Sequence, residues 1–411
     1  MLRWIIFLII FIILDYYAFQ AFKTVVKNNW LFAIYWVITL LVVGNFVYNY
    51  YDFSRRDGFT HANSYAVGFF IAILIPKLIL LFAVFAEDIF RAPMALYRYF
   101  TEGDMVKGNY FPARRAFISK IALGLAAIPF TSVLYGIYKG RYNYKVLKYT
   151  MEFDDLPKAF DGYKITQISD IHSGSFDDKE KVAYAVNLIN EQKSDVILFT
   201  GDMVNNKAEE MHDYMNIFGK LEAKDGLFSI LGNHDYGDYI SWESEEAKDQ
   251  NLENLKDIQK QLGFDLLLNE SRYLEKNGEK IALVGVENWG SGGFKQAGDL
   301  KKASQHINEN DFKILMSHDP THWEQEVLKD KYHYHLTLSG HTHGMQFGIE
   351  IPGWIKWSPS KWRYKYWAGI YNIGEEYINV NRGFGYLAFP GRVGIWPEIT
   401  VIELKRRNKV A

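Results

Sequence analysis

Five short stretches of the sequence place aspartate, asparagine or histidine directly after an apolar run. They read Ser169-Asp170-Ile171-His172, Gly201-Asp202, Gly232-Asn233-His234-Asp235, Ser317-His318-Asp319 and Gly340-His341-Thr342-His343-Gly344. Each apolar run has the length of a buried strand, and ligands of α/β proteins bind beyond the carboxyl ends of strands. Five separate loops can therefore converge on one site. Glycine flanks three of the stretches, where it lets the backbone turn tightly beside a ligand.

The side chains gathered in this way are of the types that bind divalent cations. The seven candidate ligands are Asp170, His172, Asp202, Asn233, His318, His341 and His343. Imidazole, carboxylate and one amide oxygen, without thiolate, favour manganese, iron or zinc over copper(I) and over an all-oxygen magnesium or calcium cage. Seven ligands are many for one ion, so we expect two metals that share a carboxylate. Two ions about 3.5–4 Å apart can activate a hydroxide and hold a phosphoryl group for in-line attack.

The elements that must position these residues form one α/β domain. Seven short apolar, β-rich runs predict strands at residues 164–170, 196–202, 227–232, 280–287, 312–317, 336–340 and 399–404. Helical spacing relates Val182, Val186 and Ile189, and also Leu252, Leu255, Ile258 and Leu262. Strands that alternate with helices indicate a buried, partly parallel sheet.

The order of the five blocks resembles that of the calcineurin-like metallophosphoesterases, over residues 145–408. The resemblance implies a four-layer α/β/β/α sandwich of two mixed sheets and a metal-dependent phosphoric ester hydrolase. By position, it implies that Asp170, His172 and His343 bind the first metal, that Asn233, His318 and His341 bind the second, and that Asp202 bridges them. It also implies that His234 contacts a phosphate oxygen or protonates the leaving group, and that Asp235 orients His234.

The residues themselves agree with a catalytic role for His234. This histidine follows the candidate ligand Asn233, so a titratable group lies beside the metals, and an adjacent carboxylate can hold its imidazole in one tautomer. The alternative is that His234 is a further metal ligand.

The first third of the chain is apolar enough for a membrane. Runs near residues 4–22, 30–48, 65–85 and 117–138 approach the ~20 apolar residues that cross a bilayer core. The first run is too long for a signal peptide and lacks a small-residue cleavage site, so we interpret it as an anchor. We expect Asp15 at an interface and Lys77 to extend toward one. The predicted organisation is a transmembrane region at residues 1–140 and a metallophosphoesterase domain at 141–411.

Basic residues give the expected orientation. The loops that carry Lys23, Lys27 and Arg91 favour the cytoplasmic side, although basic residues after the fourth span balance this count. The stretch at residues 114–120, with Arg114 and Arg115, resembles a twin-arginine export signal; a plain basic flank of a membrane helix is the alternative. We therefore expect a protein of the bacterial cytoplasmic membrane with its C-terminal domain on the extracytoplasmic face.

Composition excludes several other classes. The 411 residues include no cysteine, which excludes disulfides, cysteine zinc sites, iron–sulfur clusters and thiol nucleophiles. The net charge of -2 argues against binding to a nucleic-acid duplex.

One segment outside the motifs stands out. Residues 352–371 interleave tryptophan with lysine and arginine, as Trp354, Trp357, Trp362, Trp367, Lys356, Lys361, Arg363 and Lys365. This mixture suits a membrane-docking loop or a wall for a lipid-linked substrate. A packed cap over the sheet edge is the alternative. Arg382 and Arg392 are either phosphate-binding groups or members of surface ion pairs.

Together these features predict a membrane-anchored, dinuclear phosphoesterase acting on a phosphate ester or pyrophosphate. A lipid-linked substrate fits the anchor and the tryptophan-rich segment. The alternatives are a phosphodiesterase or phosphatase acting on soluble nucleotides, and a non-catalytic sensor that binds metal and phosphate. The residues indicate no oligomeric state.

Overall fold

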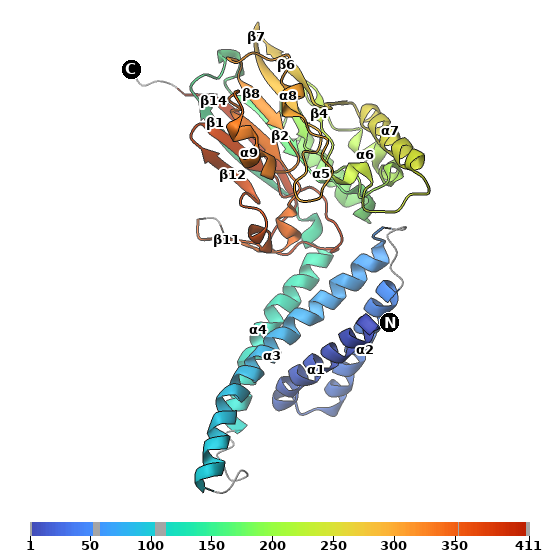
Figure 1. The fold of residues 1–411 in the computed structure, drawn as a ribbon, viewed down its shortest axis with the longest axis vertical. Helices are drawn as coiled ribbons and strands as arrows, with labels where there is room; N and C mark the ends of the chain where they lie inside the picture. The colour runs from blue at the N-terminus through green and yellow to red at the C-terminus, as the bar shows by residue number, and fades with distance from the viewer. Residues whose placement is uncertain (1, 52–57, 103–111, 352, 408–411) are drawn as a thin grey trace. The chain divides into compact units, whose positions relative to one another are not determined.

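The computed structural model describes residues 2–51, 58–102, 112–351 and 353–407. The chain divides into two compact units, one built from four long helices that end at Tyr138 and one that continues from Lys139. The four helices are α1 (Leu2–Val25), α2 (Asn29–Tyr51), α3 (His61–Glu102) and α4 (Pro112–Tyr138) (Figure 1). Arg55, Arg56 and Lys107, which also count among the basic residues that set membrane orientation, lie outside the described residues.

All four helices contain a stretch long and apolar enough to cross a membrane. These stretches are Leu2–Val25, Asn29–Tyr51, His61–Ile89 and Ala113–Tyr138. Each expected span lies inside one of them, so the chain is an integral membrane protein.

The expectation for Asp15 and Lys77 was wrong. Both side chains are buried inside the helical unit, and the Lys77 ammonium lies 2.7 Å from the Asp15 carboxylate. The Tyr35 hydroxyl donates to Asp15, and Lys77 donates to Thr39. A buried pair with these partners satisfies both charges within the bundle, so neither side chain needs to reach an interface.

The second unit contains two six-stranded mixed sheets. The first has the order β1 (Lys145–Phe153), β14 (Glu398–Arg406), β2 (Tyr163–Ile168), β3 (Val196–Phe199), β4 (Leu227–Ser229) and β5 (Phe264–Leu266). The second has the order β12 (Gly369–Ile373), β13 (Glu376–Val380), β9 (Leu336–Ser339), β8 (Lys313–Met316), β7 (Glu279–Gly285) and β6 (Glu270–Lys276). A separate hairpin joins β10 (Ile349–Ile351) to β11 (Ile355–Trp357).

Alternation of side chains along the strands divides this unit into layers. In β3, Val196 and Leu198 join the apolar cluster between the sheets, whereas Ile197 and Phe199 join the cluster on the outer face. The outer cluster includes residues of α5 (Lys179–Asn190) and α7 (Glu245–Gln261), and α6 (Met215–Phe218) contributes Phe218. Short helices α8 (Leu300–Ala303) and α9 (Thr321–Gln325) cover the second sheet. The expected α/β/β/α sandwich is confirmed (Figure 1).

Candidate metal centre

The five chemical stretches follow strands whose carboxyl ends lie at a common edge. In the first sheet, β2, β3 and β4 run parallel, and in the second sheet β8 runs parallel to β9. Parallel neighbours place the loops after them side by side. Asp170 follows β2 by two residues and His318 follows β8 by two, so short connections hold these side chains close to the rigid sheets.

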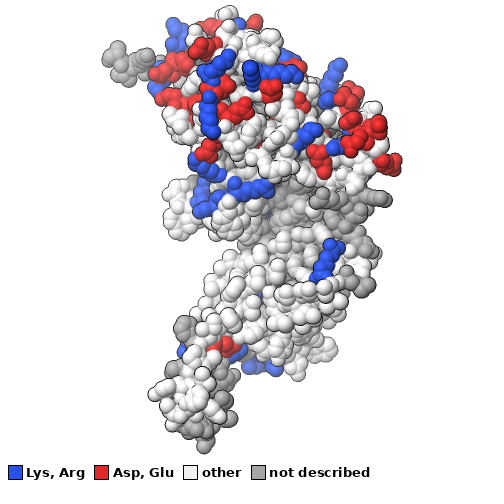
Figure 2. Space-filling view, viewed as in Figure 1, with Lys and Arg blue, Asp and Glu red and all other residues white. Residues whose placement is uncertain are grey.

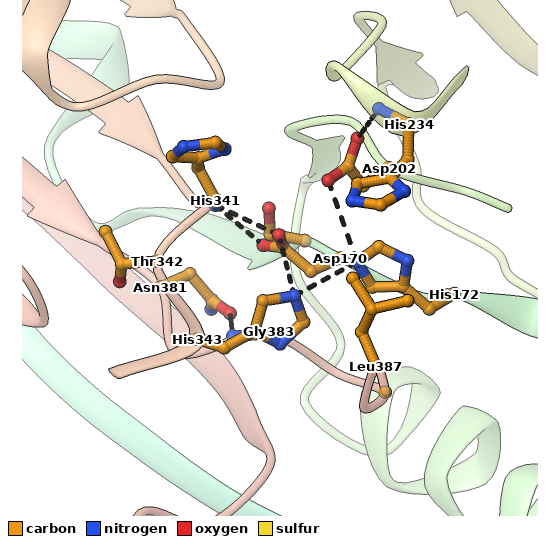
Figure 3. Close-up of polar contacts among 12 residues, drawn as sticks. Asp170, His172, Asp202, His234, His341, Thr342, His343, Asn381, Gly383 and Leu387 are labelled. Atoms are coloured by element: carbon orange, nitrogen blue, oxygen red, sulfur yellow. Dashed lines mark hydrogen bonds and ion pairs between the residues drawn. The ribbon is translucent and has the colours of Figure 1, made fainter. Parts of the chain in front are cut away.

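The first ligand group is formed by Asp170, His172 and His343, all buried. Nε2 of His343 lies 3.2 Å from Asp170 Oδ1 and 3.0 Å from Nε2 of His172. Their ligand atoms all lie within 4.8 Å of one another. Figure 3 shows the three side chains pointing toward one another.

The second ligand group contains Asp202, His318 and His341, with Asn233 beside them. Nε2 of His318 lies 3.1 Å from Asp202 Oδ2, and Nδ1 of His341 lies 2.7 Å from Asn233 Oδ1. The same Asp202 oxygen lies 3.6 Å from Nε2 of His172 in the first group. All seven candidate ligands are therefore brought together, and the Asp202 carboxylate faces both groups.

The spacing and chemistry of these atoms fit divalent cations. Two ligand atoms about 2.1 Å from one ion and at right angles to each other lie about 3 Å apart, close to the separations found here. Within the described residues, Nε2 of His318 has no hydrogen-bond partner, although it is buried and aimed at Asp202. Burial of two carboxylates requires nearby positive charge, which two cations would provide.

The pKa shifts of Asp202, His341 and His172 also favour metal binding. Burial opposes ionisation of Asp202, but His318 and His234 hold its pKa well below the usual range. Burial lowers the pKa of His341 to about 4, against the pull of Asp319, so its imidazole is neutral at pH 7. Burial likewise holds the pKa of His172 well below its usual value. Burial opposes the charge on His318, but the Asp202 carboxylate raises the pKa of this imidazole to about 10, so metal binding must displace its proton. Ionised carboxylates and neutral imidazoles are the forms that bind metal.

Outer hydrogen bonds fix the orientation of the ligands. The carbonyl oxygen of Thr200 lies 2.6 Å from Nδ1 of His318, which leaves Nε2 toward Asp202. The Tyr364 hydroxyl lies 2.8 Å from Nε2 of His341, which leaves Nδ1 toward Asn233. The backbone N–H of His341 donates to both oxygens of Asp170 (Figure 3). Such partners set the tautomer and direction of metal ligands.

The backbone at the site is strained. Five of the seven candidate ligands have a φ between 49° and 73°, namely Asp170, His172, Asp202, His341 and His343. Non-glycine residues rarely adopt this region, and clusters of such residues occur where function requires them. Gly201 has a φ of 91°, and a Cβ there would lie 2.5 Å from the backbone nitrogen of Gly232. The loops after β3 and β4 can thus approach closely only because Gly201 lacks a side chain.

His234 and Asp235 both lie at this site, but they do not contact each other in the way that we expected. Nδ1 of His234 lies 2.8 Å from the carbonyl oxygen of Asn205, so that carbonyl orients the ring. Asp235 is buried and accepts hydrogen bonds from the backbone N–H groups of Asp202, Met203 and Gly232. The expectation that Asp235 orients His234 was wrong, because its carboxylate instead ties the loops after β3 and β4 together.

Aromatic side chains that sequence reasoning missed surround the ligands. The ring of Tyr239 lies 4.3 Å from that of His234, centroid to centroid, and Phe294 lies 4.8 Å from His341. Tyr364 belongs to the tryptophan-rich segment, whose composition already drew attention to it. Tyr239 and Phe294 belong to no motif that could have identified them. Each of the three rings therefore contacts either His234 or His341.

The two candidate phosphate-binding arginines have other partners. Arg382 is buried and pairs with Glu350 and Glu398. Arg392 is fully buried, and its Nε and Nη2 both donate to the carbonyl oxygen of Gly385. Both guanidinium groups hold the C-terminal loops in place, and the ion pair of Arg382 is buried rather than on the surface.

Comparison with known proteins gives two family models and several relatives. Residues 2–141 match a model described as a probable calcineurin-like phosphoesterase transmembrane domain, and residues 163–345 match the calcineurin-like phosphoesterase model. An uncharacterized metallophosphoesterase of Bacillus subtilis, YkuE, is 31% identical over 72% of this chain and 99% of its own length. An uncharacterized metallophosphoesterase of Helicobacter pylori is 26% identical over the full length of both chains. A transmembrane protein with a metallophosphoesterase domain from Danio rerio is 26% identical over 68% of this chain and 62% of its own.

Proposed function

The chain belongs to the calcineurin-like metallophosphoesterases, which are metal-dependent phosphoric ester hydrolases, and we propose that its two ligand groups form one dinuclear centre that hydrolyses a phosphate ester or pyrophosphate. The observation that carries this proposal is the position of Asp202, whose carboxylate faces both groups. Two ions of manganese, iron or zinc would supply an activated water and neutralise charge on the phosphoryl oxygens.

The chain's own residues meet the other needs of the reaction. With Nδ1–H of His234 donating to the Asn205 carbonyl, Nε2 can take up a proton and pass it to the leaving oxygen, or contact a phosphoryl oxygen. Asp235 acts as a positioning residue, because its bonds to backbone N–H groups hold Asp202 beside Asn233. The rings of Tyr239, Phe294 and Tyr364 pack against His234 or His341 and add apolar surface beside the site.

The test is metal-dependent hydrolysis of bis-p-nitrophenyl phosphate by the detergent-purified chain. The parent should bind two manganese ions per chain and hydrolyse the ester. Asp202→Asn, which removes one charge and keeps the shape, should lose bound metal and at least about 100-fold in rate. Asp213→Asn is the matched control, since Asp213 is exposed and pairs only with Lys179 among the described residues. Parent-like activity in Asp202→Asn would contradict the proposal.

We propose a lipid-linked phosphate or pyrophosphate as substrate rather than a soluble nucleotide. Six residues separate the end of α4 at Tyr138 from the start of β1 at Lys145, so the catalytic unit is tethered at the membrane. Rates on detergent-dispersed phospholipids should therefore exceed those on nucleotides. The reverse order would favour the nucleotide hydrolase. Two bound metals without hydrolysis of any ester would favour the alternative of a non-catalytic sensor that binds metal and phosphate.

The proposal also covers the location of the catalytic unit, on the extracytoplasmic face of a bacterial membrane. It is supported by Lys23 in the last turn of α1, by Lys27 between α1 and α2, and by the Arg114-Arg115 pair. Arg115 also has a structural role, because it pairs with Asp88 of α3. Protease added to intact spheroplasts should degrade this unit, and full protection would contradict the proposed face.

A further inference from the structure

The hairpin after the last ligand loop exposes an unusual apolar surface. We call this surface the interfacial patch, and it consists of Met345, Ile349, Ile351, Trp354, Ile355 and Trp362. The two tryptophans are each 76% exposed. Hairpin strands β10 and β11 carry three of the six residues, and among the described strands they pair with each other alone. Exposed apolar patches bordered by polar residues mark sites that contact a protein, a ligand or a membrane.

Basic side chains border the interfacial patch. Lys356, Lys361, Arg363 and Lys365 lie within or directly beside its segments. In the described part of the chain, carboxylates pair with Lys365 and with Arg382, but none pairs with Lys361 or Arg363. Figure 2 shows blue side chains beside the white surface at the end of the second unit where Figure 1 labels β11. The patch is thus apolar with a positive rim.

The interfacial patch adjoins the metal centre along the chain. It begins at Met345, two residues after His343, and ends at Trp362, two residues before Tyr364. Between Trp362 and Tyr364, the Arg363 guanidinium lies 5.0 Å from the ring of Phe294 and 5.3 Å from that of Tyr364. Both rings contact His341. Arg363, Phe294 and Tyr364 therefore link the end of the patch to the candidate ligand His341.

We propose that the interfacial patch inserts into the headgroup region of an anionic bilayer and that the metal centre takes its phosphoester from that bilayer. Tryptophan prefers the headgroup level, apolar neighbours enter the acyl boundary, and lysine and arginine face anionic lipid. The tether after α4 keeps the patch at a high effective concentration near the membrane, so weak docking is sufficient. The second half of this inference rests on the proposed function, whereas the docking itself does not.

The first experiment uses the absence of cysteine from the chain. Trp354→Cys and Trp362→Cys, each labelled with an environment-sensitive fluorophore, are reconstituted as full chains into vesicles of phosphatidylcholine and phosphatidylglycerol. Glu253→Cys on α7 is the matched control, because Glu253 is exposed on an element remote from β11 (Figure 1). Spin-labelled lipid should quench both patch labels and leave the α7 label unchanged.

Two outcomes would overturn docking. One is patch labels that report water, like the α7 label. The other is efficient cross-linking of Trp354→Cys chains to each other by a short bis-maleimide in vesicles, which would show that a second copy covers the patch.

The second experiment tests whether docking selects the substrate. Hexadecyl p-nitrophenyl phosphate in vesicles and methyl p-nitrophenyl phosphate in water share one leaving group and differ in membrane residence. In the double variant Trp354→Ser/Trp362→Ser, the changed side chains form no hydrogen bond or ring contact with a candidate ligand within the described residues. It should lower the rate on the hexadecyl ester about tenfold and change the methyl ester by less than about twofold.

The outcomes separate the two proposals. Equal effects on both esters would overturn membrane selection while leaving hydrolysis established. A parent chain that hydrolyses neither ester would contradict the proposed function, and the quenching result would still decide docking.

Discussion

The hydroxyl of Tyr364 lies 2.8 Å from Nε2 of His341, while the other ring nitrogen of His341 lies 2.7 Å from the amide oxygen of Asn233. One end of the imidazole thus faces the second ligand group, and the other is held by a tyrosine from a different part of the chain. The tyrosine hydroxyl can accept a hydrogen bond from Nε2–H, and in that tautomer Nδ1 is left available to a metal.

Tyr364→Phe removes only the hydroxyl that holds His341. We expect the affinity of one of two manganese sites to fall about 10- to 100-fold, with the other site unchanged. Titration of the metal-free full chain, followed by manganese electron paramagnetic resonance, measures both affinities. Tyr184→Phe is the control, because Tyr184 is exposed on α5. Unchanged affinities in Tyr364→Phe would show that the hydroxyl does not orient a ligand.

His234→Asn separates proton donation from metal binding. If His234 protonates the leaving oxygen, the variant should keep both metals and lose about 100- to 10,000-fold in kcat on an ester with an alkoxide leaving group. The loss should be much smaller with p-nitrophenolate, which leaves without a proton.

Metal content is measured beside the rates on dimethyl and bis-p-nitrophenyl phosphate. An equal loss on both esters would rule out the proton donor and leave the phosphate contact. Loss of a metal would support the alternative in which His234 is a ligand.

A histidine outside the site should control stability in acid. His335 is buried against the ring of Phe312, and its Nε2 lies 2.7 Å from Asp155. Burial lowers the pKa of His335 to about 4, despite Asp155, whereas an unfolded histidine titrates near 6.5. The unfolded chain therefore binds more protons between these values, and the free energy of unfolding falls as pH drops from about 6.5 to about 4, by up to about 3 kcal/mol.

Thermal unfolding of the full chain at pH 4.5 and pH 7 measures this effect. His335→Gln removes the titrating group and should reduce the difference between the two pH values. His212→Gln, at an exposed histidine, should keep the parent's difference. A His335→Gln chain with the full parental difference would assign the acid sensitivity to other groups.

Local patterns in the sequence predicted the framework of this site well. Each of the seven predicted β runs overlaps a strand, and convergence of the loops followed from one rule about the ends of strands. Strands β1 and β6 were missed because both are partly exposed and carry lysine or glutamate, so they lack an apolar run. The small strands β12 and β13 were also missed, because they lie in a stretch rich in glycine and asparagine.

Contacts between distant segments could not be predicted in the same way. The carbonyl that orients His234 comes from Asn205, and the neighbouring Asp235 was the obvious but wrong choice. Sequence adjacency places two side chains on the same loop but does not fix the direction in which each points. Asp235 points into the loop backbone, where unpaired N–H groups would otherwise be buried.

The membrane unit offers a last prediction, since Asp15 of α1 and Lys77 of α3 are buried as a pair. Lys77→Met leaves the Asp15 carboxylate without its cation in an apolar bundle, and breaking such a pair costs about 3–5 kcal/mol. Asp15→Leu/Lys77→Met removes both charges and should recover most of that loss. Thermal unfolding in detergent measures the order of stabilities, with Lys120→Met as control, because Lys120 is exposed on α4.

The double variant also distinguishes a structural pair from a functional one. If the pair only fixes how α1 and α3 pack, the double variant should hydrolyse methyl p-nitrophenyl phosphate at the parent's rate. A double variant less stable than Lys77→Met would show that the Tyr35 and Thr39 partners, left without their acceptor and donor, matter more than the charges. Because both partners come from α2, that outcome would mean that the contacts of α2 with α1 and α3 contribute more to stability than the charge pair does.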